Sequence, residues 1–138
     1  MRHVGKASRA YNLYRNEKME RLGISGSQGT FLLAVIRHPG VSQEELADRL
    51  VFNKSSVARK IAELEAKGFV FRRRSETDKR QFCVFATEEG AKLAPEIIRI
   101  NQEFFSRLKE SFTEEEWEQL GFLSEKLSLC AKEAIKEL

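Results

Sequence analysis

The chain has 138 residues, 41% of them hydrophobic and 33% charged, which suits one folded domain or two small lobes that share a core. No stretch approaches the roughly 18 uncharged apolar residues of a membrane span, so no membrane partner is expected. No apolar run follows the first six residues, so we expect no signal peptide and a cytoplasmic protein.

The net charge of +3 is unevenly distributed along the chain. Residues 1–87 carry 17 Lys and Arg against 9 Asp and Glu, whereas residues 88–138 carry 7 against 12. This polarity indicates one end that faces phosphate and another that avoids nucleic acid. The alternative is two ordinary solvated surfaces whose charges differ by chance.

Few residues are suited to catalysis or metal binding. Cys83 and Cys130 lie far apart without a CxxC pair, and the histidines are His3 and His38. This spacing does not make a zinc site, and a reducing cytoplasm disfavours a disulfide. No Gly-rich phosphate loop or Ser/His/Asp order is present. We therefore expect no catalytic residue, no metal and no cofactor, and a protein that is not an enzyme.

The first third of the chain predicts two helices. Apolar residues spaced near one face favour a helix from about Arg2 to Arg21. Ser25 and Gln28 form a Ser-x-x-Gln capping box that opens a second helix through Ile36. The His38-Pro39-Gly40 sequence ends this region.

Residues 42–68 predict a helix-turn-helix. Ser42 and Glu45 form a second capping box, which opens a helix over 43–50. Asn53 is a good N-cap for a helix over 54–67, and Gly68 ends that helix. Within it, apolar residues at i, i+4 and i+7 mark the buried face: Val57, Ile61 and Leu64.

A hairpin follows the second of these helices. Residues 69–72 and 82–86 are short β-prone runs, and the polar stretch between them can turn. By strand alternation Val84 faces the core, which leaves Phe71 and Phe85 on the outer face. We predict that these two rings form a cross-strand contact.

The C-terminal part predicts two further helices. Thr87 caps a long helix to about Ser111, in which Pro95 should introduce a kink or delay the regular start. Thr113 and Glu116 form a third capping box. The last helix has apolar residues at alternating spacings of three and four, which predicts pairing with another helix and hence a homodimer: Leu120, Leu123, Leu127, Cys130 and Ala134.

A helix-turn-helix followed by a basic hairpin, or wing, presents a helix to the major groove of duplex DNA and an arginine to the minor groove. Short or polar side chains on the first turns of the second helix let it approach base edges. In the wing, Asp78 is expected to hold Arg80 extended through a charge-assisted hydrogen bond. The predicted DNA-binding residues are Lys54, Ser55, Ser56, Arg59, Lys60, Arg73, Arg74, Lys79 and Arg80.

Two other interpretations remain for these basic residues. The basic side chains could form an ordinary solvated helix face with a surface ion pair in the wing. The domain could also be a winged-helix protein-interaction module that does not bind DNA. Such modules usually lack a basic recognition face, whereas residues 49–80 hold ten Lys and Arg against four Asp and Glu.

Segments spread over nearly the whole chain match the pattern of one family: Leu22–Ile24, Gln28, Val41–Ala47, Leu64–Val70, Arg72–Arg73, Asp78–Arg80, Val84, Thr87 and Glu89–Gly90. Through them the sequence resembles the MarR family of winged helix-turn-helix regulators. The resemblance implies a mainly α fold with a small β-hairpin wing (α+β), in which 25–87 form the DNA-binding lobe and 1–24 with 88–138 form a helical dimerisation region. It departs from the family at Phe71, where a polar or acidic residue is common.

The resemblance also implies a function. Members are homodimers that bind pseudo-palindromic double-stranded DNA, commonly as repressors, with the second helix of the motif in the major groove and the wing in the minor groove. Many are released by a small aromatic effector, bound in a crevice that Tyr11, Tyr14 and Arg15 could line here. The competing interpretation is that both tyrosines only pack between helices.

Overall fold

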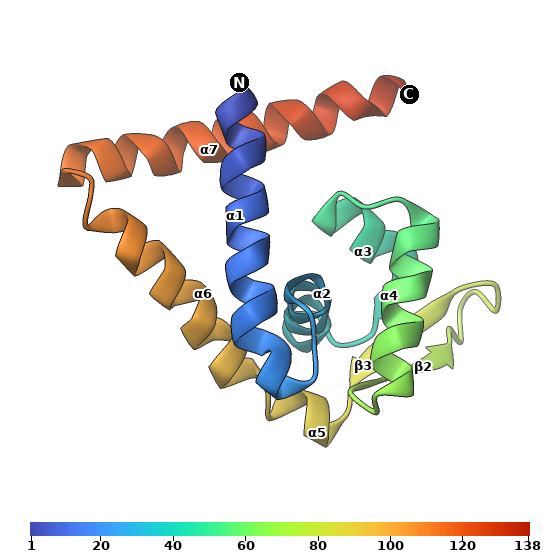
Figure 1. Ribbon diagram of the computed structural model, residues 1–138. Coiled ribbons are helices and arrows are strands. Elements are labelled where there is room, and N and C mark those ends of the chain that lie inside the picture. Colours follow the sequence, from blue (N-terminus) through green and yellow to red (C-terminus); the bar gives the residue numbers. More distant parts are fainter. The chain divides into compact units, whose positions relative to one another are not determined.

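Seven α-helices, two short 3-10 turns and three strands form the computed structural model, which describes residues 1–138 (Figure 1). The helices and the small β-hairpin confirm the mainly α architecture with a wing. The chain divides into two compact units, Met1–Asn101 and Gln102–Leu138.

The first unit begins with two helices in contact, α1 (Arg2–Met19) and α2 (Gly26–Arg37). A 3-10 turn, η1 (Glu20–Leu22), ends the first helix. The predicted capping box is confirmed: Gln28 N–H donates to Ser25 Oγ at 3.2 Å, and Ser25 N–H donates to Gln28 Oε1 at 3.0 Å. These two bonds satisfy backbone donors that the start of α2 would otherwise leave unpaired.

The predicted helix-turn-helix consists of α3 (Gln43–Leu50) and α4 (Lys54–Ala66). Ser42 caps α3 by accepting from Glu45 N–H at 3.0 Å, and Asn53 caps α4 by accepting from Ser56 N–H at 2.8 Å. Of the two hydrogen bonds of the predicted capping box at Ser42, the structure shows the one that the Ser42 side chain accepts from the Glu45 backbone. The core of this unit includes the predicted apolar face of α4 and residues of α2 and α3: Phe31, Leu32, Leu46, Val57, Ile61 and Leu64.

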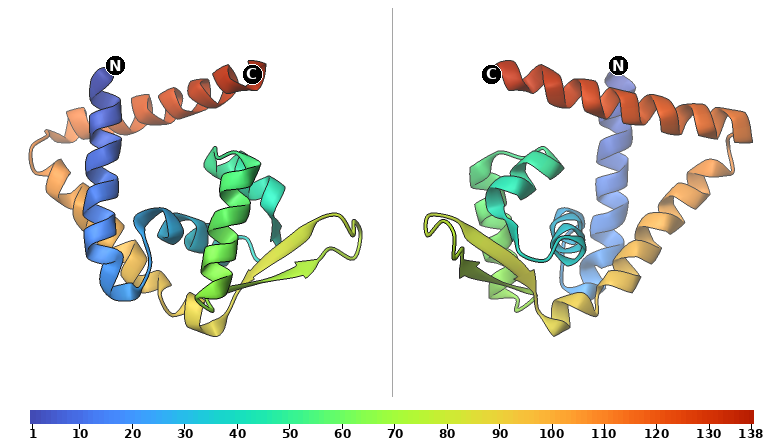
Figure 2. Two further views of the ribbon diagram at one scale, coloured as in Figure 1. Left: turned by 45° about the vertical axis from the view of Figure 1, so that its right-hand side comes forward. Right: turned by 180° about the vertical axis from the view of Figure 1, so that it is seen from behind.

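The hairpin is confirmed as β2 (Val70–Arg74) and β3 (Phe82–Ala86), and in the left-hand view of Figure 2 its turn projects away from α4. A third strand, β1 (Val41–Ser42), pairs with β3, so the antiparallel order is β1-β3-β2. Val84 is fully buried at the centre of this sheet.

The predicted aromatic pair is present on the other face of the hairpin. Phe71 and Phe85 lie opposite each other in the β2–β3 register, and their ring centroids are 5.4 Å apart with an interplanar angle of 17°. Stacked rings at this distance stabilise a two-stranded ribbon that would be marginal alone.

The long helix expected from Thr87 is interrupted. It forms a short helix, α5 (Glu88–Ala91), and a longer one, α6 (Ala94–Lys109). Pro95 lies in the first turn of α6, where a missing N–H leaves no helical hydrogen bond unmade, so the expected delay in the regular start is confirmed.

The second unit contains the end of α6 and the helix α7 (Glu114–Ala134), which ends in a 3-10 turn, η2 (Ile135–Glu137). Its predicted capping box is confirmed, since Thr113 and Glu116 exchange bonds of 2.9 and 3.1 Å. None of the side chains of α7 is buried in the single chain. No helix of the protein combines the length and the apolar character needed to span a bilayer.

Candidate nucleic-acid interface

The first turns of α4 present several of the predicted DNA-binding side chains to solvent. Lys54, Ser55 and Arg59 are exposed, and Ser56 is half-buried. Ser55 Oγ donates to Asn53 Oδ1 at 2.8 Å, so its hydroxyl is held at the start of the helix. Short polar groups beside an exposed Arg59 permit close approach to a base edge, where a guanidinium can bind guanine with two hydrogen bonds.

Lys60 has a different environment from the other basic residues of α4. Only 21% of its side chain is exposed, and its Nζ lies 3.5 Å from Glu63 Oε2. The buried Gln28 of α2 donates to that same carboxylate oxygen at 2.8 Å and accepts from Lys67 Nζ at 2.8 Å. The hydrogen bond from Gln28 and the Lys60 charge lower the pKa of Glu63. Lys60 therefore belongs to a polar network that holds α4 against α2.

The base of the wing is joined to α4 by Arg72, which the sequence did not single out as a DNA-binding residue. Its Nη2 donates to Glu65 Oε1 at 3.0 Å, and its backbone N–H donates to Glu65 Oε2 at 3.2 Å. The hydrogen bond from Arg72, together with its charge, lowers the pKa of Glu65. Arg72 is thus engaged inside the lobe and fixes the hairpin relative to the helix.

The tip of the wing is ordered by backbone contacts. Arg74 Nη1 donates to the Lys79 carbonyl at 2.6 Å, which closes the turn from one strand. Asp78 Oδ1 accepts from the Arg80 backbone N–H at 3.0 Å. This differs from the expectation that Asp78 would hold the Arg80 guanidinium: the acid fixes the turn, because in a two-residue separation its side chain reaches the backbone donor first.

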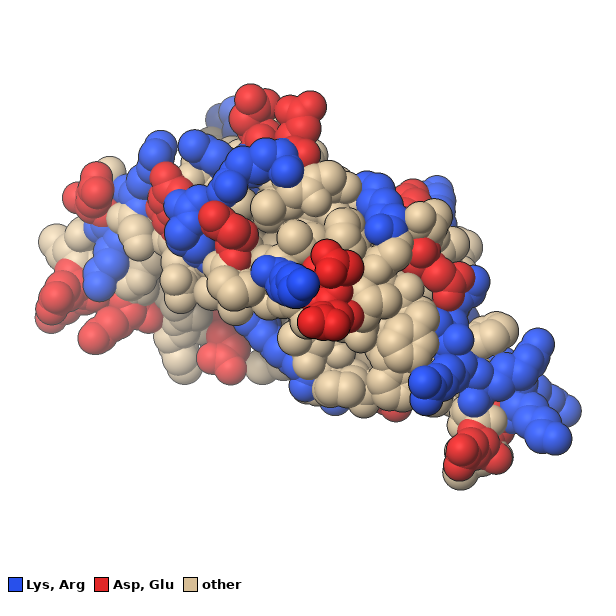
Figure 3. Space-filling model, turned by 90° about the horizontal axis from the view of Figure 1, so that it is seen from below, with Lys and Arg blue, Asp and Glu red and all other residues tan.

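Arg73 lies on the aromatic face of the hairpin. Its guanidinium carbon is 5.1 Å from the Phe71 ring centroid and 5.7 Å from that of Phe85, both within cation–π range. In Figure 3 the Lys and Arg side chains gather at the right-hand end of the molecule, where Figure 1 places the hairpin. The exposed basic residues of the hairpin are Arg73, Arg74, Lys79 and Arg80.

A separate cavity of about 320 Å³ brings together two of the three residues predicted to bind an effector. Arg15 is buried, donates to Thr30 Oγ1 at 2.6 Å and lies 4.6 Å from the Tyr11 ring centroid. Tyr14 does not line this cavity and packs instead against the apolar core. Sequence reasoning missed the remaining lining residues, which lie on distant elements: Thr30, Leu33, Ala34, Arg37, His38, Arg49, Leu50 and Asn101.

Two of the residues that line this cavity each have a polar atom without a partner in the chain. Arg15 Nε and Asn101 Oδ1 are both buried and make no hydrogen bond. Buried polar groups usually have a partner, so these two atoms are exceptions in the fold. Three arginines beside a tyrosine and two leucines form a cationic, partly apolar site.

Comparison with known proteins identifies the family of this chain. The sequence model of the MarR family matches residues 22–81. The HTH-type transcriptional regulator BilQ of Clostridium symbiosum is 31% identical over 128 residues, which cover 88% of this chain and 89% of BilQ.

Solved structures agree with this result. A MarR transcriptional regulator from Methanosarcina mazei is 34% identical, with a TM-score of 0.81 and full coverage of both chains. A MarR-family regulator from Listeria monocytogenes in complex with a 26-mer DNA is 27% identical, with a TM-score of 0.90 and coverage of 96% of this chain and 89% of the other.

Proposed function

The chain belongs to the MarR family of DNA-binding transcriptional regulators, which are not enzymes, and from this premise we propose that it is a repressor that binds a pseudo-palindromic operator as a homodimer. In this proposal residues 25–87 form the DNA-binding lobe, whereas 1–24 and 88–138 form the dimerisation region. A dimer that covers a promoter represses by excluding the transcription machinery from the same DNA.

The observation that carries the proposal is the exposure of Arg59 on α4 together with a basic wing that is fixed to the same helix by Arg72 and Glu65. Arg59, with Lys54, Ser55 and Ser56, would read the major groove, and Arg80 would enter the minor groove. Three further basic residues of the wing would lie close to phosphates: Arg73, Arg74 and Lys79. Lys60 would stabilise the packing of α4 against α2 through Glu63, which also contacts Gln28.

The apolar surface of α7 supports the homodimer. Leu120, Leu123 and Leu127 are 41%, 58% and 40% exposed in the single chain, although they follow the spacing of a helix-pairing seam. An exposed apolar stripe of this length is costly in water, and a second copy of the same helix can cover it.

The cavity around Arg15 supports release by a small aromatic acid. The guanidinium groups of Arg15, Arg37 and Arg49 suit a carboxylate, and the Tyr11 ring with Leu33 suits an aromatic body. Isothermal titration of benzoate against the neutral benzamide tests this charge preference. We expect the acid to bind and to weaken DNA binding; equal binding of both would contradict it.

A protein-interaction module without DNA binding is the alternative function. It is less well supported, because the exposed groups on α4 and the wing are basic and polar rather than apolar. The fully buried centre of a protein interface is depleted in charged residues.

Selection of duplex DNA from a random pool, followed by fluorescence anisotropy, separates these functions. We expect enrichment of an inverted repeat whose half-sites are centred about 10 bp apart, one helical turn. Affinity should fall steeply between low and moderate salt, because bound phosphates release counterions. No enriched sequence, or binding that is insensitive to salt, would contradict the proposed function.

A further inference from the structure

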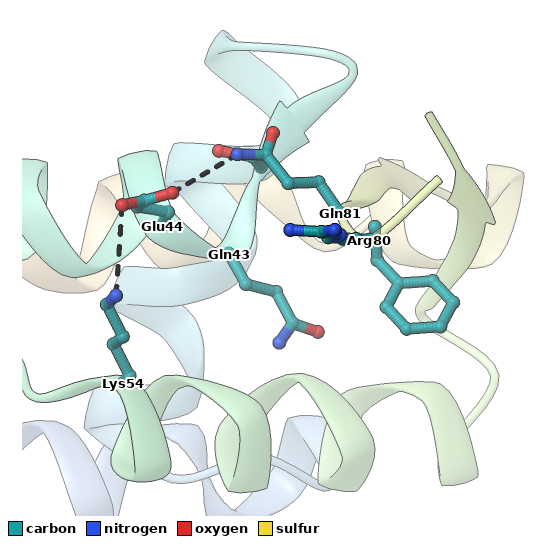
Figure 4. Close-up of a pocket in the computed structure, with 7 residues that line it drawn as sticks. Gln43, Glu44, Lys54, Arg80 and Gln81 are labelled. Carbon is teal, nitrogen blue, oxygen red and sulfur yellow. Dashed lines mark hydrogen bonds and ion pairs between the residues drawn. The ribbon is translucent and has the colours of Figure 1, made fainter. Parts of the chain in front are cut away.

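A small pocket of about 200 Å³ lies between the helix-turn-helix and the wing. Its lining comes from three separate elements: Ser42–Glu44, Lys54 and Arg80–Phe82. Glu44 Oε1 lies 3.8 Å from Lys54 Nζ, and Glu44 Oε2 accepts from Gln81 Nε2 at 3.1 Å. In Figure 4 the Glu44 carboxylate stands between the Lys54 ammonium and the Gln81 amide.

Most of the polar side chains that line this pocket are hydrogen-bond donors, and one is an acid. Lys54, Arg80, Gln43 and Gln81 all supply hydrogen-bond donors, and Glu44 is the one acidic residue of the lining. The Lys54 and Glu44 side chains are 81% and 62% exposed, so water screens their ion pair. Exposed pairs of this kind change an equilibrium by at most about fivefold, and a competing anion can therefore displace the carboxylate.

The position of the pocket indicates which anion competes. A recognition helix in the major groove and a wing in the adjacent minor groove are separated by one sugar-phosphate backbone. The pocket lies between the start of α4, where Lys54 is, and the wing, where Arg80 is. If both elements enter neighbouring grooves, the backbone between those grooves passes over the pocket, and a phosphate faces the donors that Glu44 now uses.

We propose that this pocket is a subsite for one backbone phosphate of each DNA half-site, and that the Glu44 carboxylate occupies it in the free protein. The proposal rests on the proposed function, since it requires α4 and the wing to bind adjacent grooves. Glu44 holds Lys54 and Gln81 in place before binding, and its displacement lowers the affinity for every DNA sequence. Glu44 therefore competes with the DNA phosphate for Lys54 and Gln81 and so limits the strength of binding.

The test compares Glu44→Gln with Glu45→Gln in the full chain by fluorescence anisotropy on duplex DNA. Both variants remove one negative charge from an exposed side chain in the first turn of α3, but only Glu44 contacts Lys54 and Gln81. The glutamine at 44 can still accept from Gln81, so the wing keeps its contact. We expect Glu44→Gln to tighten binding about two- to fivefold per half-site, and Glu45→Gln to have a smaller effect.

Two further measurements identify Lys54 and the phosphate as the partners. In a Lys54→Gln background the gain from Glu44→Gln should disappear, because the two residues act through one contact. A scan of duplexes with single neutral methylphosphonates should abolish the gain at one position in each half-site. Three outcomes would overturn the proposal. The gain in affinity could be the same in Glu45→Gln, it could survive in the Lys54→Gln background, or it could be unaffected by every neutralised phosphate. If the native protein binds no duplex DNA, the proposed function fails as well.

Discussion

Arg72 and Glu65 join the wing to α4 through three hydrogen bonds, from the Arg72 backbone N–H, Nε and Nη2 at 3.2, 3.4 and 3.0 Å. Neither residue needs to contact DNA for this pair to affect binding, because it determines the angle between the two elements that would enter neighbouring grooves. A rigid wing also loses less conformational freedom on binding.

Glu65→Gln should reduce the amount by which the free energy of unfolding falls at acidic pH. The folded-state pKa of Glu65 is lowered, so its contribution to the free energy of unfolding is present above the unfolded pKa and is lost as the pH falls through the folded one. Because the pair is partly exposed, the loss at neutral pH should be at most about 1 kcal/mol. Urea unfolding at neutral pH and at about pH 3 measures the difference. Glu76→Gln, which removes an exposed acid of the hairpin turn and leaves the contact between Glu65 and Arg72 intact, is the control.

Substitution of both Phe71 and Phe85 by threonine should loosen the wing while leaving the core of the lobe folded. The stacked pair is worth about 0.2–1 kcal/mol in a sheet, and its loss also removes the surface on which the Arg73 guanidinium lies. DNA affinity should fall more than thermal stability, as anisotropy and circular dichroism would show. An equal fall in both would mean that the pair belongs to the core instead.

Asp78→Ala and Asp78→Asn distinguish the observed contact from the expected one. The asparagine keeps an oxygen that accepts from the Arg80 backbone N–H, whereas the alanine does not. If Asp78 acts on DNA affinity by fixing the turn, Asp78→Asn should bind DNA like the native protein, and Asp78→Ala should partly resemble Arg80→Ala.

Arg59→Ala should behave differently from these wing variants. We expect a loss of about 1–3 kcal/mol in the free energy of DNA binding and a relaxed preference at one base position. Equal losses for all of them on every sequence would indicate phosphate contacts only.

Leu127→Glu should dissociate the proposed homodimer. The substitution places a charge without a partner at the centre of the apolar seam of α7, which a second copy is expected to cover. Light scattering at micromolar concentration should show a dimer for the native protein and a monomer, or unfolded protein, for the variant. The control is Lys126→Glu at the neighbouring exposed position. It changes the net charge by more than Leu127→Glu does, but the protein should stay dimeric. A stable native monomer would contradict the proposal.

The elements that the sequence predicted well are those whose signals are local. The capping boxes at Ser25 and Thr113, the N-cap at Asn53 and the alternation that paired Phe71 with Phe85 each depend on a few neighbouring residues. The strand β1 was missed because two residues carry no alternation pattern.

The parts of the site that sequence could not give are contacts between distant segments. Gln28 meets Glu63 across 35 positions and Glu44 meets Gln81 across 37, and no spacing rule connects residues so far apart. Lys60 stays a predicted DNA-binding residue, and its neighbour Glu63 is the residue that accepts from the distant Gln28. Periodicity identifies which face of a helix is polar, but only the fold shows which polar residues are already paired.

Val51→Gly should stabilise the protein. Val51 ends α3 with φ of 57°, the left-handed region, where a β-branched side chain is disfavoured by about 1–2 kcal/mol. Its side chain is 49% exposed, so little apolar burial is lost with it. Glycine also raises the conformational entropy of the unfolded chain, which offsets part of this gain. The net rise in the free energy of unfolding should be up to about 1 kcal/mol.

The matched control is Gly68→Ala at the end of α4. Gly68 has φ of 78°, and a Cβ there would meet no atom within 4 Å, so alanine introduces the same backbone conflict without a steric clash. Urea unfolding should therefore show a rise in the free energy of unfolding for Val51→Gly and a fall of about 1 kcal/mol for Gly68→Ala. If Val51→Gly lowers stability instead, contacts of the valine side chain in the turn outweigh the cost of its backbone conformation.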